Sequence, residues 1–307
     1  MLRIRGRKMQ ENLNNFVGGK SFETRASKIM EEKTVTHQRK SLAYRLMTSF
    51  SILFAIGILI FIIAYVSIKG IPYLKPSLFS FNYTSENVSL MPALITTIYM
   101  VVASVIISSV IGISTAIYLV EYAKPGSKFV SVIRIVTETL AGIPSIVYGL
   151  FGFLFFGLSL KFAYSFLSGL LTICIMILPP IVRSTEEALI SVNKSYREGS
   201  YALGAGHIRT IFKIVLPVAM PGILSGVILA IGRVVGETAA LLYTLGSSTN
   251  IPRTPMESGS TLALHMYKLS SEARHTGEAF ATGFILLLIV FLLNFISGRL
   301  AKKLGGK

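Results

Sequence analysis

Tyr196 to Pro217 reads Y-R-E-G-S-Y-A-L-G-A-G-H-I-R-T-I-F-K-I-V-L-P, a polar stretch between two long apolar ones. Apolar and small residues recur in it at intervals of four, three, four and three, which is typical of one helical face: Tyr201, Ala205, Ile208, Phe212 and Val215. Gly204 and Gly206 interrupt this pattern, as a tight bend requires. The stretch therefore predicts a short helix, a turn and a second short helix leading into the next apolar run.

Apolar runs dominate the rest of the chain. Of its 307 residues 52% are hydrophobic and 14% charged, and the mean hydropathy is +0.66, too apolar for an ordinary soluble domain. A helix needs roughly 20 apolar residues to cross a bilayer. The sequence predicts an all-α polytopic membrane protein with about six transmembrane helices: Phe50 to Ile68, Ala93 to Val120, Leu140 to Leu160, Phe162 to Val182, Ile214 to Leu242 and Ala279 to Ser297.

Basic residues are distributed unevenly between the loops that alternate along the chain. The N-terminal tail, the loops 121–138 and 183–213 and the C-terminal tail carry 23 Lys and Arg, against six in the opposite loops. Cytoplasmic loops retain such residues, so both termini are predicted to be cytoplasmic. The net charge of +16 lies mostly in these loops and predicts attraction to anionic membrane lipid rather than binding of nucleic acid.

The runs and loops divide the chain into four parts. Residues 1–45 form a basic cytoplasmic tail, predicted to be weakly ordered because it lacks an apolar core. Residues 46–90 hold the first span, predicted to remain as an uncleaved anchor, and an external loop. Residues 91–298 form the main transmembrane domain, and residues 299–307 a basic cytoplasmic tail.

Residues suited to catalysis or to binding a metal are sparse. The one cysteine, Cys174, lies in an apolar run, and the four histidines lie far apart without ligand spacing. The sequence contains no G-x-x-x-x-G-K-[ST] loop that would cradle nucleotide phosphates. It therefore predicts no enzyme, no metal site and no cofactor, and any ATP hydrolysis is expected in a separate subunit.

The stretch from Tyr196 resembles the E-A-A-x-x-x-G-x9-I-x-L-P signature of permease subunits of ABC importers. The matching positions are Glu198, Gly204, Ile214, Leu216 and Pro217, with Gly199 and Ser200 in place of the two alanines. The resemblance implies the type I ABC importer (MetI-like) permease fold. It also implies that residues 195–213 are a coupling loop, which docks in a cleft of an ATPase subunit dimer.

Two further segments narrow the resemblance. L-A-G-I-P-S-I-V-Y-G-L-F-G (residues 140–152) and G-R-V-V-G-E-T-A-A-L-L-Y-T (residues 232–244) resemble phosphate-importer permeases, and the second is more similar to the PstA type than to the PstC type. This resemblance implies a phosphate substrate, a second related permease subunit and an extracytoplasmic phosphate-binding protein. The expected location is the bacterial cytoplasmic (inner) membrane.

Three charged residues are candidates for the substrate path. Arg233 and Glu237 lie in an apolar run, where an ionised side chain costs about 2.5 to 3.5 kcal/mol and usually faces a partner or a water-filled path. Spaced four apart on a helix, they can pair with each other. Alternatively, Arg233 donates to a phosphate oxygen, and Glu237 orients Arg233 or accepts a hydrogen bond from protonated phosphate.

Position along the helix does not decide whether Arg233 pairs with Glu237 or binds phosphate. Arg233 follows Pro217 by sixteen residues, which places it roughly 24 Å along a helix, beyond the midplane. Arg183 matches a basic position in phosphate permeases, or is a cation that flanks the membrane.

Other functions also remain open. The chain is alternatively a permease for molybdate, tungstate or sulfate, the paired PstC-type subunit, or a membrane scaffold or sensor in phosphate signalling. A permease for another oxyanion would share the loop around Glu198 but not the segment around Arg233. A sensor would retain signalling while transporting nothing.

Overall fold

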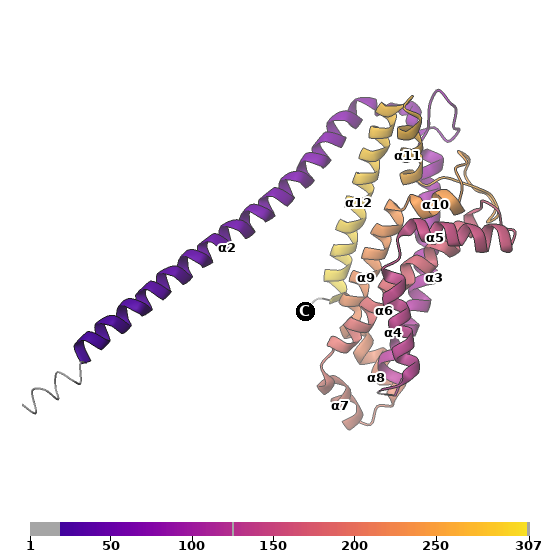
Figure 1. Ribbon diagram of the computed structural model, residues 1–307. Coiled ribbons are helices and arrows are strands. Elements are labelled where there is room, and N and C mark those ends of the chain that lie inside the picture. The colour runs from indigo at the N-terminus through magenta and orange to yellow at the C-terminus, as the bar shows by residue number, and fades with distance from the viewer. Residues whose placement is uncertain (1–18, 125, 306–307) are drawn as a thin grey trace, which may run out of the picture. The chain divides into compact units, whose positions relative to one another are not determined.

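The computed structural model describes residues 19–124 and 126–305, and every regular element in these ranges is a helix (Figure 1). Within them, five helices are long and apolar enough to cross a membrane, or six if one bent pair counts as a single span. The prediction of an all-α membrane protein with about six spans is confirmed. The chain divides into two compact units, residues 1–64 and residues 65–307.

The first span belongs to a long helix, α2 (Gly19–Gly70). Tyr44–Tyr73 is its candidate membrane span. The predicted tail before residue 19 lies outside the described residues, whereas residues 19–45 belong to helix α2. This segment contains four Lys, three Glu and three Arg, all good helix formers, and no proline, so the helix continues from the apolar run.

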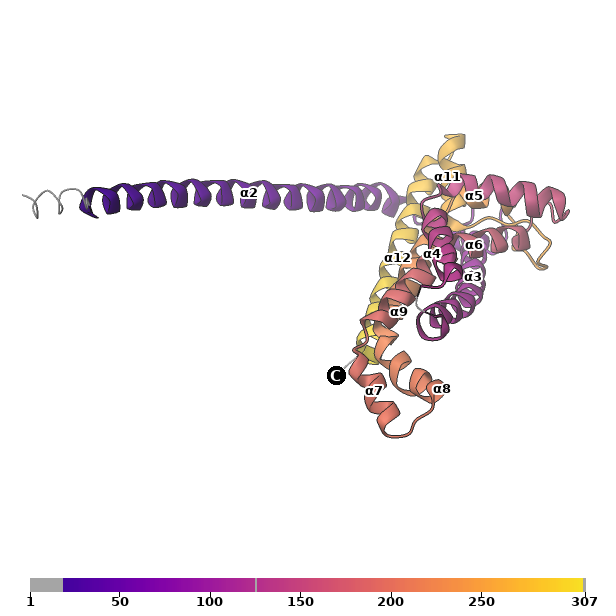
Figure 2. The ribbon, with the colours of Figure 1, turned by 60° about the horizontal axis from the view of Figure 1, so that its bottom comes forward.

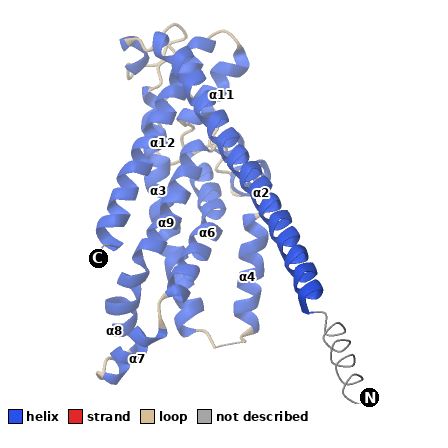
Figure 3. Ribbon diagram, turned by 90° about the vertical axis from the view of Figure 1, so that its left-hand side faces the viewer, coloured by secondary structure: helices blue, strands red, loops and turns tan. Residues whose placement is uncertain are grey.

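The second unit is a helical bundle built around α6, which packs against α3, α4 and α9 (Figure 3) and also against α5 and α10. Its long helices are α3 (Met91–Ile117), α6 (Phe166–Ser191), α9 (Leu216–Gly236) and α12 (Thr276–Gly305). The shorter α11 (Leu262–Glu272) lies at one end of this bundle, and α7 and α8 lie at the other (Figure 1).

Small residues let α9 approach α6 closely. A Cβ added at Gly222 would lie 2.7 Å from the Cβ of Ala188, and one added at Gly226 would collide with Ser184. Gly222 thus faces Ala188, and Gly226, four residues later on α9, faces Ser184, four residues earlier on α6. The two helices therefore run antiparallel. Close approach of this kind is a common source of packing energy between helices in membranes.

The span predicted from Leu140 to Leu160 is not one continuous helix. The chain forms α4 (Lys128–Ala141) and then α5 (Ser145–Gly152) with a π-helical continuation to Ser159, and the two parts are bent by 103°. Pro144 causes the break because proline lacks an amide hydrogen and disfavours helical geometry at the residue before it. Helix α4 also includes residues 128–138, which were predicted to lie in a loop.

The predicted span from Ile214 to Leu242 also ends early. Helix α9 stops at Gly236, Glu237 adopts an extended conformation (φ −73°, ψ 126°), and a separate short helix, α10 (Ala239–Thr244), follows. Residues 246–261 then form a helix-free connection that reaches α6, where the Phe166 and Leu167 amides donate to the carbonyls of Glu257 and Pro255.

Candidate functional site

The polar stretch that follows α6 forms the helix, turn and helix predicted from its spacing. α7 (Lys194–Ala202) is followed by a turn at Gly204, α8 (His207–Thr210) and a π-helical segment, η5 (Ile211–Val215), which continues into α9. Gly204 has a φ of +80°, a conformation that glycine adopts without penalty. Figure 2 shows α7 and α8 projecting from the end of the bundle. We call residues 194–215 the α7–α8 loop.

Hydrogen bonds within the loop hold its two arms together. The hydroxyls of Ser200 and Thr210 lie 2.8 Å apart in a buried contact, and the Ala205 amide donates to the Ser200 carbonyl. The hydroxyl of Tyr201 lies 2.8 Å from Nδ1 of His207. Ser200, which replaces an alanine of the signature, therefore faces the interior of the loop.

The outer surface of the loop is strongly apolar. Leu203 is 90% exposed, Ile208 65% and Phe212 52%, whereas Val215 is completely buried. Val215 therefore does not share the exposed face on which Ile208 and Phe212 lie, although the spacing predicted one common face. The exposed residues leave apolar area available to a docked protein.

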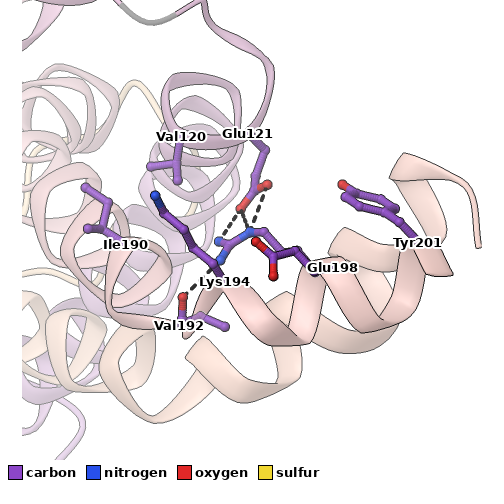
Figure 4. A pocket seen from close by; sticks show the side chains of 8 residues that line it. Val120, Glu121, Ile190, Val192, Lys194, Glu198 and Tyr201 are labelled. Atoms are coloured by element: carbon purple, nitrogen blue, oxygen red, sulfur yellow. Dashed lines mark hydrogen bonds and ion pairs between the residues drawn. The ribbon is translucent and has the colours of Figure 1, made fainter.

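Glu198 is exposed on α7 and makes no ion pair with the described residues. It lines a cavity of about 420 Å³, together with Glu121, Lys194, Arg197 and Tyr201 (Figure 4). Neighbouring Gly199 is also exposed, and an added Cβ there would meet no atom within 4 Å. The loop thus presents a carboxylate beside a bare stretch of backbone.

The remaining signature residues lie where the loop joins the membrane helix. Ile214 lies in η5, and Leu216 and Pro217 begin α9, which follows η5. Val215 before them is itself helical (φ −68°, ψ −50°), so the loop runs into α9 without a break. These residues therefore lie where the loop continues into the membrane helix.

Arg197 connects the loop to the bundle, a role that the sequence analysis missed. Its Nη2 lies 2.6 Å from Oε1 of Glu121 in the π-helical turn η3 (Tyr118–Tyr122) at the end of α3. The guanidinium also donates to the carbonyls of Leu189 and Val192 at 3.0 Å each. The spacing of residues near Arg197 could not reveal this contact, because Glu121 lies 76 residues away.

Arg233 and Glu237 do not form the helical pair that their spacing suggested. Arg233 lies half-buried in the last turn of α9, and among the described residues it makes no ion pair. Glu237 lies beyond the end of that helix, is 8% exposed, and its Oε1 accepts a hydrogen bond from the Ala240 amide at 3.0 Å. The two side chains therefore have separate local roles.

Tyr148 of α5, which the sequence gave no reason to select, belongs to the same buried cluster as Val234, the residue after Arg233. It is 4% exposed, and its hydroxyl donates to the Leu140 carbonyl at 2.7 Å. Helix α5 thus packs in the cluster that includes the last turn of α9.

Arg183 lies on α6, away from Arg233. It is exposed and forms an ion pair with Glu187 at 3.0 Å. Because α6 and α9 run antiparallel in the register set by Ser184 and Gly226, Arg183 lies near the level of Val227, about 9 Å along the axis from Arg233. A second ion pair on this helix joins Glu186 to Arg134 of α4 at 2.7 Å.

Comparison with known proteins identifies the family. Residues 108–306 match the model of the binding-protein-dependent transport system inner membrane component. The chain belongs to this family. The matched range includes the α7–α8 loop, α9 and α10, so both candidate regions lie within the membrane component of a binding-protein-dependent transport system.

Relatives and a solved structure agree with this family assignment. The chain is 32% identical over 260 residues to the probable ABC transporter permease protein YqgI of Bacillus subtilis, covering 78% of this chain and 86% of that protein. It is 39% identical over 192 residues to the phosphate transport system permease protein PstA of Mycobacterium leprae, covering 62% of each.

The fold is that of the inward-facing MetNI methionine ABC transporter, with a TM-score of 0.59 at 19% identity. The match covers 70% of this chain and 95% of the MetNI chain. The predicted MetI-like permease fold of the inner membrane component is confirmed.

Proposed function

We propose that this chain is the permease subunit of an ATP-driven phosphate importer and forms half of its translocation path. The observation that carries the proposal is the placement of Arg233 and Glu237 at the junction of α9 and α10, inside the segment that resembles phosphate permeases. The similarity to a mycobacterial protein named as a PstA phosphate permease supports the same substrate.

The chemistry of the junction suits an oxyanion. The guanidinium of Arg233 presents a planar fork of donors that matches two oxygens of phosphate, and no described carboxylate neutralises it through an ion pair. Oε1 of Glu237 is engaged by the Ala240 amide, while its Oε2 has no hydrogen-bond partner among the described residues. Oε2 can accept a hydrogen bond from a protonated phosphate oxygen, which sulfate does not supply at neutral pH.

The α7–α8 loop is the proposed docking site for the ATPase subunit dimer. The exposed Leu203, Ile208 and Phe212 supply apolar contact, and Glu198 supplies a carboxylate for a cation of the partner. With this assignment the loop is cytoplasmic, and the distribution of basic residues supports the same side for both termini. A second related permease would complete the path, and an extracytoplasmic phosphate-binding protein would deliver the substrate at the opposite end.

Transport then follows from coupling between the loop and the membrane helices. ATP binding closes the ATPase dimer, which moves the docked loops and shifts the permease between inward-open and outward-open states. Helix α9 is directly continuous with η5 of the loop, so it carries Arg233 with it.

Uptake of radiolabelled phosphate tests the proposal. Cells that lack the gene should lose uptake and recover it when the gene is restored, and an excess of sulfate or molybdate should not compete. Uptake that deletion leaves unchanged would refute phosphate as the substrate. Competition by molybdate would instead indicate a permease for another oxyanion.

Substitution of Arg233 tests the site. Arg233→Ala should abolish phosphate uptake while the ATPase subunit still copurifies with the complex. Arg233→Lys keeps the charge but loses the fork of donors, so we expect partial uptake. Normal uptake by the Ala variant would remove Arg233 from the substrate path.

A further inference from the structure

Arg197 ties three separate elements together. Its guanidinium contacts Glu121 at the end of α3 with Nη2 at 2.6 Å and Nε at 3.2 Å. It also donates to the carbonyls of Leu189 and Val192, where α6 ends. These side-chain hydrogen bonds are the only ones among the described residues that join α7 to α3 and α6. The bonds made by Ser200 and Tyr201 stay within the loop.

Arg197 and its neighbour Glu198 face different surroundings. The Arg197 side chain is 17% exposed and that of Glu121 only 5%, so solvent and salt screen their attraction weakly. Glu198 is exposed and lines the cavity of about 420 Å³ that Glu121 and Arg197 also line (Figure 4). The same turn of α7 therefore exposes the carboxylate of Glu198 and holds the guanidinium of Arg197 against the bundle.

The geometry suits transmission of a displacement. An arginine held by two nitrogens on one carboxylate has little freedom to rotate, unlike a lysine ammonium. The carbonyl end of a helix also carries partial negative charge, which favours a cation at the end of α6. A shift of α7 therefore displaces the ends of α3 and α6 together.

We infer that Arg197 is a positioning residue that transmits motion of the α7–α8 loop to α3 and α6 through Glu121 and the end of α6. This inference rests on the proposed function, because it requires an ATPase docked on the loop and a transported substrate. Arg197 itself contacts neither; it determines how much of the loop's motion reaches the membrane helices.

Three variants separate the contacts. Arg197→Gln removes the charge and the fork, Arg197→Lys keeps the charge alone, and Glu121→Gln removes the charge of the partner but leaves the bonds to the α6 carbonyls. Arg134→Gln is the matched control, because it breaks another arginine–glutamate ion pair between two helices, Arg134 of α4 with Glu186 of α6, which lies outside the α7–α8 loop.

The measurement is the number of phosphate ions transported per ATP hydrolysed by the complete importer in proteoliposomes. We expect Arg197→Gln to lower this ratio about tenfold, a typical coupling between distant sites, while ATP hydrolysis persists. Arg197→Lys should lower it less, and Arg134→Gln should not change it. The double variant Glu121→Gln/Arg197→Gln should be no worse than Arg197→Gln alone, because both substitutions break one contact.

Three outcomes would overturn the inference. An unchanged ratio in Arg197→Gln would show that the contact transmits nothing. Multiplying effects of the two substitutions would show that the residues act independently. Loss of the ATPase from both Arg197 variants would show that Arg197 only shapes the docking surface. A wild-type complex that transports no phosphate refutes the proposed function instead, so the two failures are distinguishable.

Discussion

The Ala240 amide donates a hydrogen bond of 3.0 Å to Oε1 of Glu237, across the break between α9 and α10. A carboxylate at this position satisfies one of the free amides at the start of a helix and interacts favourably with its dipole. Glu237 is therefore a capping residue of α10, as well as a candidate for the substrate path. The two roles can be separated experimentally.

Substitution of Glu237 distinguishes capping from charge. Glu237→Gln keeps an oxygen that can accept the Ala240 bond, so the free energy of unfolding should change little, whereas Glu237→Ala should lower it by about 1 kcal/mol. If Oε2 also serves phosphate, both variants should lose uptake. Thermal unfolding of the purified complex, paired with uptake, checks this; normal uptake in the Gln variant would leave Glu237 with the capping role alone.

The sequence predicted the elements that depend on local pattern. The apolar runs marked the spans, and Gly204 marked the bend of the α7–α8 loop, because hydrophobic period and the freedom of glycine act within a few residues. The predicted bounds of two spans were wrong, because the helix breaks inside a long apolar run. The breaks lie at Pro144 and at Glu237, and hydropathy alone does not detect them. The Arg197 contact with Glu121 depends on the tertiary fold and was not predictable.

Gly204 should tolerate no side chain. Its φ of +80° costs a residue with a Cβ about 1 to 2 kcal/mol, so Gly204→Ala should distort the bend and weaken copurification of the ATPase. Gly199→Ala is the matched control in the same loop. It lies in helical α7 with no atom within 4 Å of an added Cβ, and alanine favours the helix. Equal copurification by both variants would contradict the role of the bend.

Gly149 should be needed for the contact between α5 and α10. An added Cβ would lie 2.9 Å from Cα of Ala240 and 3.1 Å from the carbonyl oxygen of Ala239, and backbone atoms cannot move aside as a flexible side chain can. We expect Gly149→Ala to lower the free energy of unfolding by about 1 to 3 kcal/mol. Gly232→Ala on α9, where an added Cβ meets nothing within 4 Å, should not lower the thermal unfolding midpoint.

His265 on α11 should make stability depend on pH. Burial lowers its pKa to about 4, against a partial opposing effect of a hydrogen bond to the Val88 backbone, while Lys268 lowers the pKa further and Glu272 raises it. The side chain is 4% exposed, its ring packs edge-on against Tyr83, and its Nε2 has no described partner. The folded protein therefore keeps His265 neutral at a pH where the unfolded chain takes up a proton.

The sign of the pH effect follows from this difference in bound protons. Above the unfolded pKa of about 6.5 the histidine is neutral in both states, and as the pH falls from about 6.5 to 4 the unfolded state gains the proton first. Stability should fall by about 3 kcal/mol over this window relative to a variant without the histidine. Unfolding midpoints of wild type and His265→Gln, measured from pH 8 to pH 4, should diverge only below about pH 6.5. Parallel curves for the two proteins would show that His265 does not hold its neutral form.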